Sequence, residues 1–599
     1  MLLRASRLAN LKSVGLLAAV GLLAGGSLAV NPADAANPAS GTVSDTSRST
    51  TWTGGPFVVS NPTGTALDPP DCSQPGFCDD YTLKVDTSST YGSTHQLKIT
   101  VSWGTPGEDY DVYLLDGNNN SVSSAATSSN PEIILVEPKA GNYTVRVVPF
   151  AVVPGSTYSA TAELVDKPAN PAPSSINPPK LESYGAPESL PRSHDAGEPS
   201  IGNNWNTGAT FYQAYKATYK LTFDTAKPPQ ATWTDVTATA AKGCAGGNTT
   251  SLDPILYTDS TTGLTLESQL TLFNSATCVT KDDGATWSPS TGGGLPSGVD
   301  HQTLGGGPYA AGDLLPHSYP RAVYYCSQDI ATALCAISRD GGTTFGNGVP
   351  TYDLTQCGGL HGHIKVAPND GTAYLPNKGC GANQAVVVSE DNGQTWKVRP
   401  VQGSTPGDSD PSVGIGAGGA VYFGYVGADG VPRISVSNDK GQSWKNDQAV
   451  GTQFGSGGIK NAVFPAVVAG TDQRAAFAFL GTTSGGDYQD ADRFRGVWHL
   501  YVAYTYDGGA SWSTRKVDPT DPVQRGSICT GGTTCGNNRN LLDFMDATLT
   551  KQGYVEVGYA DGCTGKCVKV DKFPNNDDGG PYHDAYARVA RQYTGMPLF

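Results

Sequence analysis

Five copies of one eight-residue pattern constrain the fold of this chain more than any other feature. Each copy reads Ser or Thr, any residue, Asp, any residue, Gly, any residue, Thr or Ser, and an aromatic, at 280–287, 338–345, 389–396, 437–444 and 505–512. The Asp can accept from turn N–H groups, the Gly can take a positive φ, and the aromatic can pack between neighbouring sheets. Each copy, which we call an Asp turn, therefore predicts one tight β-hairpin.

The spacing of the Asp turns predicts a β-propeller. Their Asp residues are 58, 51, 48 and 68 residues apart, a period that suits one four-stranded blade per repeat. The chain has 75 Gly, 41 Pro and no long segment with helical periodicity, which indicates an all-β, turn-rich protein. Aligning the strand that opens each repeat gives seven starts. We expect a seven-bladed propeller over residues 186–599, with six blades as the alternative.

The N-terminal residues have the order of a secretory signal peptide. Three basic residues precede an apolar run from 14 to 30 and a small-residue cleavage site, so we expect residues 1–35 to be removed. We expect no membrane span in the rest. The net charge of −15 argues against nucleic acid or an anionic membrane as the partner. These features predict a secreted, extracellular protein. The sequence leaves the oligomeric state open, and a monomer is favoured.

The twelve cysteines are even in number and fall into near-neighbour pairs, which in an exported chain indicates disulfides. The predicted pairs are Cys72 with Cys78, Cys244 with Cys278, Cys326 with Cys335, Cys357 with Cys380, Cys529 with Cys535, and Cys563 with Cys567. A sequence cannot prove connectivity. Cys326 and Cys335 lie on consecutive predicted strands, where a cross-strand bridge is geometrically easy.

A second domain is expected ahead of the propeller. Residues 36–70 are rich in Ser, Thr, Pro and Gly and predict a flexible segment. Alternating patterns across residues 71–165 predict a small β-sandwich, and the Pro-rich stretch at 166–185 predicts a linker. The runs at 109–114 and 140–145 resemble the bacterial pre-peptidase C-terminal domain. That resemblance implies a jelly-roll accessory module of secreted hydrolases.

The strand starts of a propeller gather at one mouth of its central channel. An Asp turn follows the third strand of a blade, so the innermost strand begins on the opposite face, where a ligand is expected. One equivalent position is occupied by Glu198, Asp253, His301, His361, Asp410, Phe464 and Phe544, and the position two residues on by Ser200, Ile255, Thr303, His363, Ser412, Ala466 and Asp546. Other segments add Asp195, Asp300, Lys378, Asp408, His499, Arg539 and Asp543, and two long insertions near 481–496 and 517–540 should emerge there.

Several of these residues are candidates for chemistry. Carboxylates can supply a protonated acid and an ionised partner, and the catalytic candidates are Glu198, Asp410, Asp543 and Asp546. The substrate-binding candidates are His301, His361, His363 and Arg539. Asp-Pro and Glu-Pro at strand starts are also ordinary turn chemistry, which is the alternative for Asp253 and Asp410.

The segment His361-Gly362-His363 places two imidazoles on one side of a strand, and the pair could bind a metal. Gly362 would leave room for a close ligand. We expect both histidines to titrate near neutrality unless metallated, and their replacement to cost under about 1 kcal/mol of stability. The sequence identifies no cofactor; a divalent cation such as Ca²⁺ is the candidate.

The Asp turns resemble those of the sialidase superfamily, the BNR or Asp-box propellers, many of which are secreted glycoside hydrolases. The resemblance covers residues 186–599. Sialidases also carry an Arg-Ile-Pro motif and three arginines that bind the sialate carboxylate, whereas the matching segment here, 196–201, reads Ala-Gly-Glu-Pro-Ser-Ile. No arginine opens any repeat, so we transfer no sialidase catalytic residue.

Three functions follow from these observations. The leading one is a secreted, sialidase-like glycoside hydrolase acting on an extracellular glycan other than a conventional sialoside. The first alternative is a metal-assisted polysaccharide lyase, favoured by the histidines at the mouth. The second is a non-catalytic carbohydrate-binding or adhesive propeller whose acidic mouth holds Ca²⁺.

Overall fold

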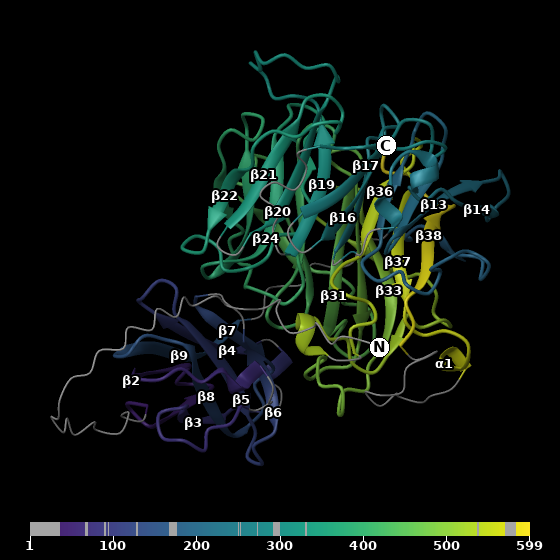
Figure 1. The fold of residues 1–599 in the computed structure, drawn as a ribbon. Helices are drawn as coiled ribbons and strands as arrows, with labels where there is room; N and C mark the ends of the chain where they lie inside the picture. Colours follow the sequence, from purple (N-terminus) through teal and green to yellow (C-terminus); the bar gives the residue numbers. More distant parts are fainter. Residues whose placement is uncertain are drawn as a thin grey trace, which may run out of the picture. The chain divides into compact units, whose positions relative to one another are not determined.

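The computed structural model describes residues 36–65, 70–88, 91–93, 95–126, 130–166, 176–248, 251, 253–271, 274–291, 300–329, 332–535, 538–569 and 583–599 (Figure 1). The predicted signal peptide, 1–35, lies outside these residues. The chain divides into two compact units, 1–168 and 169–599. Strands dominate both units, and none of the helices in the described residues has the length and apolar character needed to cross a membrane.

The N-terminal unit contains two antiparallel-rich sheets that share one core. Their orders are β1-β3-β8-β5-β6 and β2-β9-β4-β7. The strands are β1 (Ser40–Ser44), β2 (Ser49–Phe57), β3 (Asp79–Asp86), β4 (His95–Trp103), β5 (Asp109–Leu115), β6 (Ser121–Ala125), β7 (Glu132–Val136), β8 (Gly141–Ala151) and β9 (Ser156–Asp166). Alternate residues of both sheets point inward and are buried together.

The structure differs from the sequence expectation over residues 36–70. Strands β1 and β2 lie there, each paired in one of the two sheets, so the unit begins well before residue 71. Val43, Trp52 and Phe57 are buried, and exposed Thr residues flank Trp52 on both sides. Trp52 stacks on Tyr81 with 3.8 Å between ring centroids. A polar composition hid this alternation, because only three large apolar side chains carry it.

The second unit contains seven antiparallel sheets within the described residues, each built on a run of four strands. In chain order their strands are β11 (Ser200–Asn203), β12 (Thr210–Ala214), β13 (Ala217–Phe223), β14 (Ala231–Asp235); β15 (Pro254–Thr258), β16 (Thr265–Thr271), β17 (Asn274–Thr280), β18 (Ser288–Pro289); β19 (Asp300–Gly307), β20 (Ala322–Gln328), β21 (Thr332–Ser338), β22 (Val349–Asp353); β23 (Lys365–Val366), β24 (Ala373–Cys380), β25 (Asn383–Ser389), β26 (Lys397–Pro400); β27 (Ser412–Ile415), β28 (Val421–Val426), β29 (Pro432–Ser437), β30 (Lys445–Ala449); β31 (Asn461–Ala469), β32 (Ala475–Thr482), β33 (Val497–Thr505), β34 (Ser513–Lys516); and β36 (Asp546–Leu549), β37 (Val555–Asp561), β38 (Tyr586–Gln592) with β10 (Leu181–Gly185). A short strand, β35 (Gln524–Arg525), also pairs with β33.

The first strands of these sheets contact one another in sequence, and the contacts return to their starting point. Strand β11 contacts β15, and the series continues through β19, β23, β27, β31 and β36, which contacts β11 again. Side-chain hydroxyls link neighbours in this series: Thr303 accepts from the Ile364 N–H at 3.0 Å, and Ser412 accepts from the Val467 N–H at 3.0 Å. These two mouth positions therefore have structural roles.

Each Asp turn has the predicted geometry, in which the Asp accepts from the N–H four residues on. In the first turn, Asp282 accepts from the Thr286 N–H at 2.9 Å, and Gly284 has φ +78°. The Trp287 indole is buried and donates to the Val236 carbonyl, which follows the preceding sheet. The Asp carboxylates are used by the turns themselves, so they belong to the scaffold.

The six predicted disulfides are all present, with the expected partners. They join Cys72 to Cys78, Cys244 to Cys278, Cys326 to Cys335, Cys357 to Cys380, Cys529 to Cys535, and Cys563 to Cys567. The bridge between Cys326 and Cys335 crosses from β20 to β21, where the two residues are directly opposite. Each bridge spans at most 34 residues, so the disulfides fasten local segments and do not connect distant sheets.

The predicted linker region contributes to the last sheet. Strand β10 lies within 166–185 and pairs along its whole length with β38, more than 400 positions later in the chain. Glu556 of that sheet is buried and accepts from Thr210 at 2.8 Å and Asn203 at 3.3 Å, both in the first sheet. The two ends of the second unit are therefore joined by backbone pairing and by buried polar contacts.

A histidine reinforces the joint between the first and last sheets. His194 Nδ1 lies 2.8 Å from both oxygens of Asp584, and Nε2 lies 2.8 Å from Glu188. Burial lowers the pKa of His194, but the hydrogen bonds to Glu188 and Asp584 outweigh it, and the pKa is raised. Both nitrogens can donate only in the imidazolium form.

This joint predicts a pH-dependent stability. A raised folded-state pKa gives stabilisation that is complete below the unfolded value of about 6.5 and is lost as pH rises through the folded value. The melting temperature of the parent should exceed that of His194→Ala by more at pH 6 than at pH 9. Other titrating groups contribute equally to the pH dependence of both proteins, so the difference between the two removes their effect. Asp561, whose burial raises its pKa to about 8, is one such group. A difference that grows toward pH 9 would contradict this assignment.

Candidate functional site

A cavity lies at the mouth predicted from the strand starts. It is lined by His301, Gln302, His361, Gly362, His363, Asp410, Pro411, Ser412, Pro465, Phe544 and Met545. Four of the predicted site residues, His301, His361, His363 and Asp410, thus come together from three different repeats. The cavity is partly open, and its volume of about 20 Å³ has room for about one water molecule. A larger ligand would therefore lie over the mouth.

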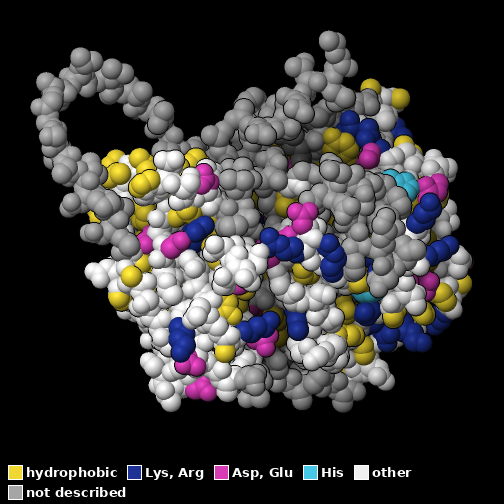
Figure 2. Space-filling model, turned by 90° about the horizontal axis from the view of Figure 1, so that it is seen from below, with side chains coloured by type: hydrophobic (Ala, Val, Ile, Leu, Met, Phe, Trp, Pro, Cys, Tyr) yellow, Lys and Arg dark blue, Asp and Glu magenta, His cyan; other side chains and the backbone are white. Residues whose placement is uncertain are grey.

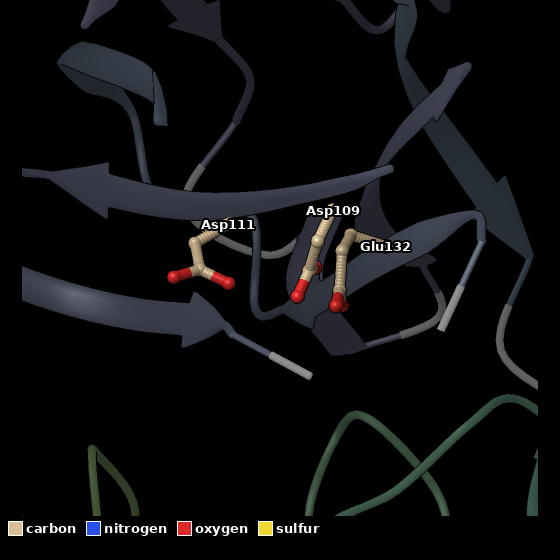
Figure 3. Close-up of side chains that lie close together, drawn as sticks. All are labelled: Asp109, Asp111 and Glu132. Carbon is tan, nitrogen blue, oxygen red and sulfur yellow. The ribbon is translucent and has the colours of Figure 1, made fainter. Parts of the chain in front are cut away.

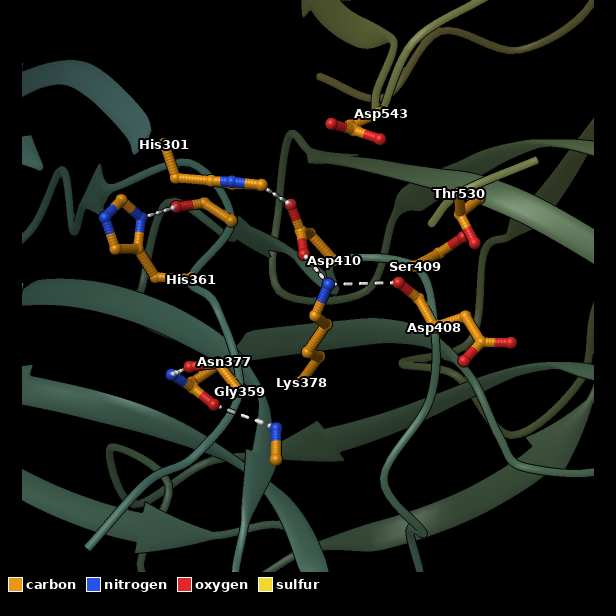
Figure 4. Close-up of polar contacts among 12 residues, drawn as sticks. His301, Gly359, His361, Asn377, Lys378, Asp408, Ser409, Asp410, Thr530 and Asp543 are labelled. Carbon is orange, nitrogen blue, oxygen red and sulfur yellow. Dashed lines mark hydrogen bonds and ion pairs between the residues drawn. The ribbon is translucent and has the colours of Figure 1, made fainter. Parts of the chain in front are cut away.

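Charged groups at the mouth form a connected network (Figure 4). His301 Nε2 is 3.0 Å from Asp410 Oδ2, and both side chains are only 8% exposed. Lys378 Nζ is 3.2 Å from the other Asp410 oxygen and donates to the Asp408 carbonyl at 3.1 Å. Burial lowers the pKa of Lys378, but the charges of Asp410, Asp543 and Asp408 outweigh this effect and raise the pKa.

Asp543 faces this network, as Figure 4 shows, and pairs with Arg539. The Arg539 guanidinium contacts both carboxylate oxygens, one of them at 2.6 Å. Burial raises the pKa of Asp543, but the hydrogen bonds and charge of Arg539, with His301 and Lys378, outweigh burial and lower it. Asp543 is therefore an ionised carboxylate. Of the two catalytic roles expected for the carboxylates, it suits the ionised partner and not the protonated acid.

His361 differs from its sequence expectation. It is 2% exposed, and its Nδ1 lies 3.0 Å from the Gly362 carbonyl, so Nδ1 carries the proton and Nε2 is an acceptor. Burial, and then the neighbouring His301, lower the pKa of His361 to about 3. The expected titration near neutrality is therefore wrong for His361, because its imidazolium would be desolvated beside a second imidazole. Replacing so buried a side chain should also cost more than the predicted 1 kcal/mol or so.

Gly362 also has a different role from the one expected. A Cβ at this position would lie 2.1 Å from the Pro411 carbonyl oxygen, which belongs to the next repeat. The absence of a side chain therefore permits the close approach of two backbone segments.

The behaviour of His361 can be measured directly. In proton NMR spectra, the imidazole Hε1 signal that disappears in a His361→Gln variant identifies His361. We expect that signal to stay at one chemical shift from about pH 5 to about pH 8, because a group with a pKa of about 3 is uncharged throughout this range. A titration midpoint between these pH values would show that solvent or an anion reaches the ring.

His363 and Asp546 lie at a second cavity of about 70 Å³, which is lined by residues further along the first strands of the sheets. His363 lines both cavities and stacks edge-on against Phe544, with 4.4 Å between ring centroids. Asp546 Oδ1 is 3.8 Å from His363 Nδ1 and 3.6 Å from Lys365 Nζ. Both distances exceed a hydrogen bond, and the cavity has room for bridging waters. Burial raises the pKa of Asp546, but Lys365 and His363 outweigh it and lower the pKa.

Glu198 shares an unusual backbone with two other strand starts. Glu198, His301 and Phe464 have φ values of +55°, +47° and +59°. Non-glycine residues rarely adopt this region, and such strain costs about 1–3 kcal/mol and concentrates at functional sites. Glu198 is buried, and it does not line the mouth cavity. The structure thus brings Asp410 and Asp543 to one network and Asp546 to the second cavity, and Glu198 lines neither cavity.

Lys378 was predicted at this face without a specific role, and the structure places it in the network. A lysine in a strand is usually a solvated residue, and only the spatial neighbours Asp408 and Asp410 mark this one as different. Pro411, Pro465 and Met545 also line the mouth. The strand-start alignment could have identified these three residues, because each directly follows a strand-start residue in the sequence.

Among the described residues, one group of three His, Cys, Asp or Glu side chains is close enough to share a metal ion. Its possible ligand atoms lie within 4.8 Å of one another. It consists of Asp109, Asp111 and Glu132, all buried in the N-terminal unit (Figure 3). Carboxylate oxygens are the ligand type that Ca²⁺ prefers. Within the described part of the chain, the mouth histidines His361 and His363 belong to no such group.

The surface charge of the molecule is mixed. On the described part of the face seen in Figure 2, Lys and Arg side chains are interspersed with Asp and Glu. The described residues of that face therefore present both signs of charge together. With a net charge of −15 for the whole chain, this mixture does not favour a polyanionic partner.

No family model and no curated protein matches this chain. Among solved structures, the chain is similar to the Hadza microbial sialidase Hz136, at 12% identity and a TM-score of 0.33, covering 83% of this chain and 93% of that one. A mutant of NanB sialidase from Streptococcus pneumoniae gives 10% identity and a TM-score of 0.33, with 83% and 94% covered. Aleuria aurantia lectin in complex with alpha-methyl-L-fucoside gives 12% identity and a TM-score of 0.32, with 54% and 96% covered.

Proposed function

We propose that residues 186–599 form a seven-bladed propeller and that the chain is a secreted glycoside hydrolase acting on an uncharged extracellular glycan. One observation carries this proposal: at the mouth, an ionised carboxylate, Asp543, faces a hydrogen-bonded His301–Asp410 pair. The six disulfides and the N-terminal sequence support export. The N-terminal unit would be an accessory module.

The chemistry needs one group that gives a proton and one that accepts it. The proton held between His301 Nε2 and Asp410 Oδ2 would pass to the departing glycosidic oxygen as its bond to the anomeric carbon breaks. Asp543 would take a proton from the water whose oxygen bonds to that carbon. His361 Nε2 would accept a hydrogen bond from the bound sugar or water. This assignment replaces a carboxylic acid with a histidine–carboxylate pair.

The pairing of charges favours an uncharged substrate. Lys378 contacts Asp410, Arg539 contacts Asp543, and Lys365 faces Asp546, so each of these cations has a carboxylate neighbour. A uronate or sialate carboxylate would have to displace one of these partners, at a cost in desolvation. For this reason the metal-assisted lyase, which also needs a ligand set absent from the described mouth residues, is not proposed.

Carbohydrate binding without catalysis is the second candidate, and the cavity size favours it. The cavity has room for about one water molecule, about 20 Å³, so a sugar ring would contact its lining from outside. Phe544, Pro411 and Pro465 beside the histidines could instead present a shallow, partly apolar surface to one face of a sugar.

A glycan screen tests both candidates. The secreted protein is applied to an array of plant, bacterial and host glycans, and the bound classes are then incubated with enzyme and assayed for new reducing ends. Release from an uncharged glycan supports hydrolysis, and binding without release supports the second candidate. A preference for sialylated or uronate-rich glycans would contradict the charge argument.

A further inference from the structure

The two long insertions of the second unit are joined to each other. The first, 483–496, lies between β32 and β33, and the second, 517–545, follows β34. The Ile528 N–H donates to the Tyr488 carbonyl at 3.1 Å, and the Thr530 N–H donates to Gln489 Oε1 at 3.0 Å. Tyr488 is 8% exposed and packs against Trp498. The two insertions therefore form one packed structure.

The first insertion contacts the mouth network through Asp408. The Tyr488 hydroxyl donates to Asp408 Oδ2 at 3.1 Å, and Gln489 Nε2 donates to the same oxygen at 3.3 Å. Gln489 thus donates through Nε2 to Asp408 and accepts through Oε1 from Thr530. Asp408 itself is exposed to solvent. Its carboxylate nevertheless accepts hydrogen bonds from two residues of the first insertion.

The main chain of Asp408 holds the other side of the connection. Its carbonyl accepts from Lys378 Nζ at 3.1 Å, and the same ammonium lies 3.2 Å from Asp410 Oδ1. The contacts run without interruption from Tyr488 and Gln489 to the Asp408 side chain. From the Asp408 carbonyl they continue through Lys378 and Asp410 to His301 (Figure 4). Asp408 lies two residues before Asp410, so a shift of one moves the other.

We propose that Asp408 is a positioning residue that couples the two insertions to the His301–Asp410–Lys378 network. Its carboxylate is held by the insertions, and this fixes the carbonyl that orients Lys378 against Asp410. The insertions thereby set the geometry in which the mouth meets its ligand. This inference rests on the proposed function for its effect on catalysis, but the coupling itself is a property of the folded protein.

The coupling is tested first by a measurement that needs no substrate. The intact secreted protein is treated briefly with an amine-reactive reagent, and labelling of Lys378 relative to the other lysines is quantified by mass spectrometry. Tyr488→Phe removes one donor and keeps the packed ring, and Asp408→Ala removes the acceptor. Tyr506→Phe is the matched control, because the Tyr506 hydroxyl donates to the Met596 carbonyl, away from this network. We expect Lys378 labelling to rise roughly threefold or more in the first two variants, because a released ammonium is more exposed and loses an anionic neighbour in Asp408→Ala.

Kinetics with a hydrolysed glycan supply the second measurement. Misplacement of a catalytic pair by about 1 Å can cost up to about a hundredfold in rate, so we expect kcat to fall about tenfold in Asp408→Ala with KM little changed. Asp408→Asn keeps an acceptor for Tyr488 and should restore most of kcat. Unchanged Lys378 labelling in both Tyr488→Phe and Asp408→Ala would overturn the proposal. If no glycan is hydrolysed, the hydrolase assignment fails while the labelling result still decides the coupling.

Discussion

The Asp543→Asn variant is expected to lose about 10²–10⁴-fold in kcat/KM on the glycan that the parent hydrolyses, the range typical of a general acid or base. An amide cannot accept the proton from the attacking water, but it preserves the shape of the side chain and one acceptor for Arg539. The loss should therefore appear in catalysis, with glycan binding reduced much less.

Asp80→Asn is a matched control for this experiment. Asp80 also accepts two hydrogen bonds from one guanidinium, that of Arg146 at 2.7 and 2.8 Å, but it belongs to the N-terminal unit. We expect its activity to equal that of the parent. The pH profile gives an independent check: because Arg539 lowers the pKa of Asp543, activity should persist below the ordinary aspartate range near about pH 3.9, and Arg539→Met should shift the acid limb upward. Full activity of Asp543→Asn would remove Asp543 from the mechanism.

The second large effect is expected from the contact between the first and last sheets. Glu556 is fully buried, pairs with Arg591, and accepts from Thr210 and Asn203 of the first sheet. Glu556→Ala leaves the Arg591 charge without its partner, and breaking a buried pair in this way costs about 3–5 kcal/mol. We expect a clearly lower unfolding temperature by scanning calorimetry.

The control for this prediction is Glu390→Ala. Glu390 pairs with Arg399 and Lys440, but its side chain is 41% exposed, and exposed pairs contribute under about 1 kcal/mol. Similar losses of stability in the two variants would mean that the Glu556 cluster does not hold the sheets together more strongly than a surface ion pair does.

The sequence predicted much of the second unit, because its signals are local. The Asp, Gly and aromatic residues of each Asp turn interact within eight residues, so their spacing is enough to place a hairpin. The strand-start alignment brought His301, His361, His363 and Asp410 to one cavity for a related reason, since a repeating fold places equivalent positions together. The strand β10 was missed, because its partner β38 lies at the other end of the chain.

The properties of the site residues were harder to predict than their location. Nothing near His361 in the sequence indicates that it is buried beside His301, and its pKa of about 3 depends on that burial. Likewise, the ionised state of Asp543 comes from Arg539, four residues away, whose direction a sequence does not specify. A repeating sequence pattern can predict which residues lie at the mouth. Their charge states depend on the residues that surround them in the folded protein, and the pattern does not specify these.

The pairing of β10 with β38 has a consequence for how the protein is made. The last sheet takes its outer strand from residues 181–185 and its neighbour from 586–592, so an early segment must wait for the ribosome to finish almost the entire chain. Until then the backbone N–H and C=O groups of β10 lack their partners on β38 and can pair with another strand. Nascent chains stalled before residue 586 should therefore be the ones that chaperones retain.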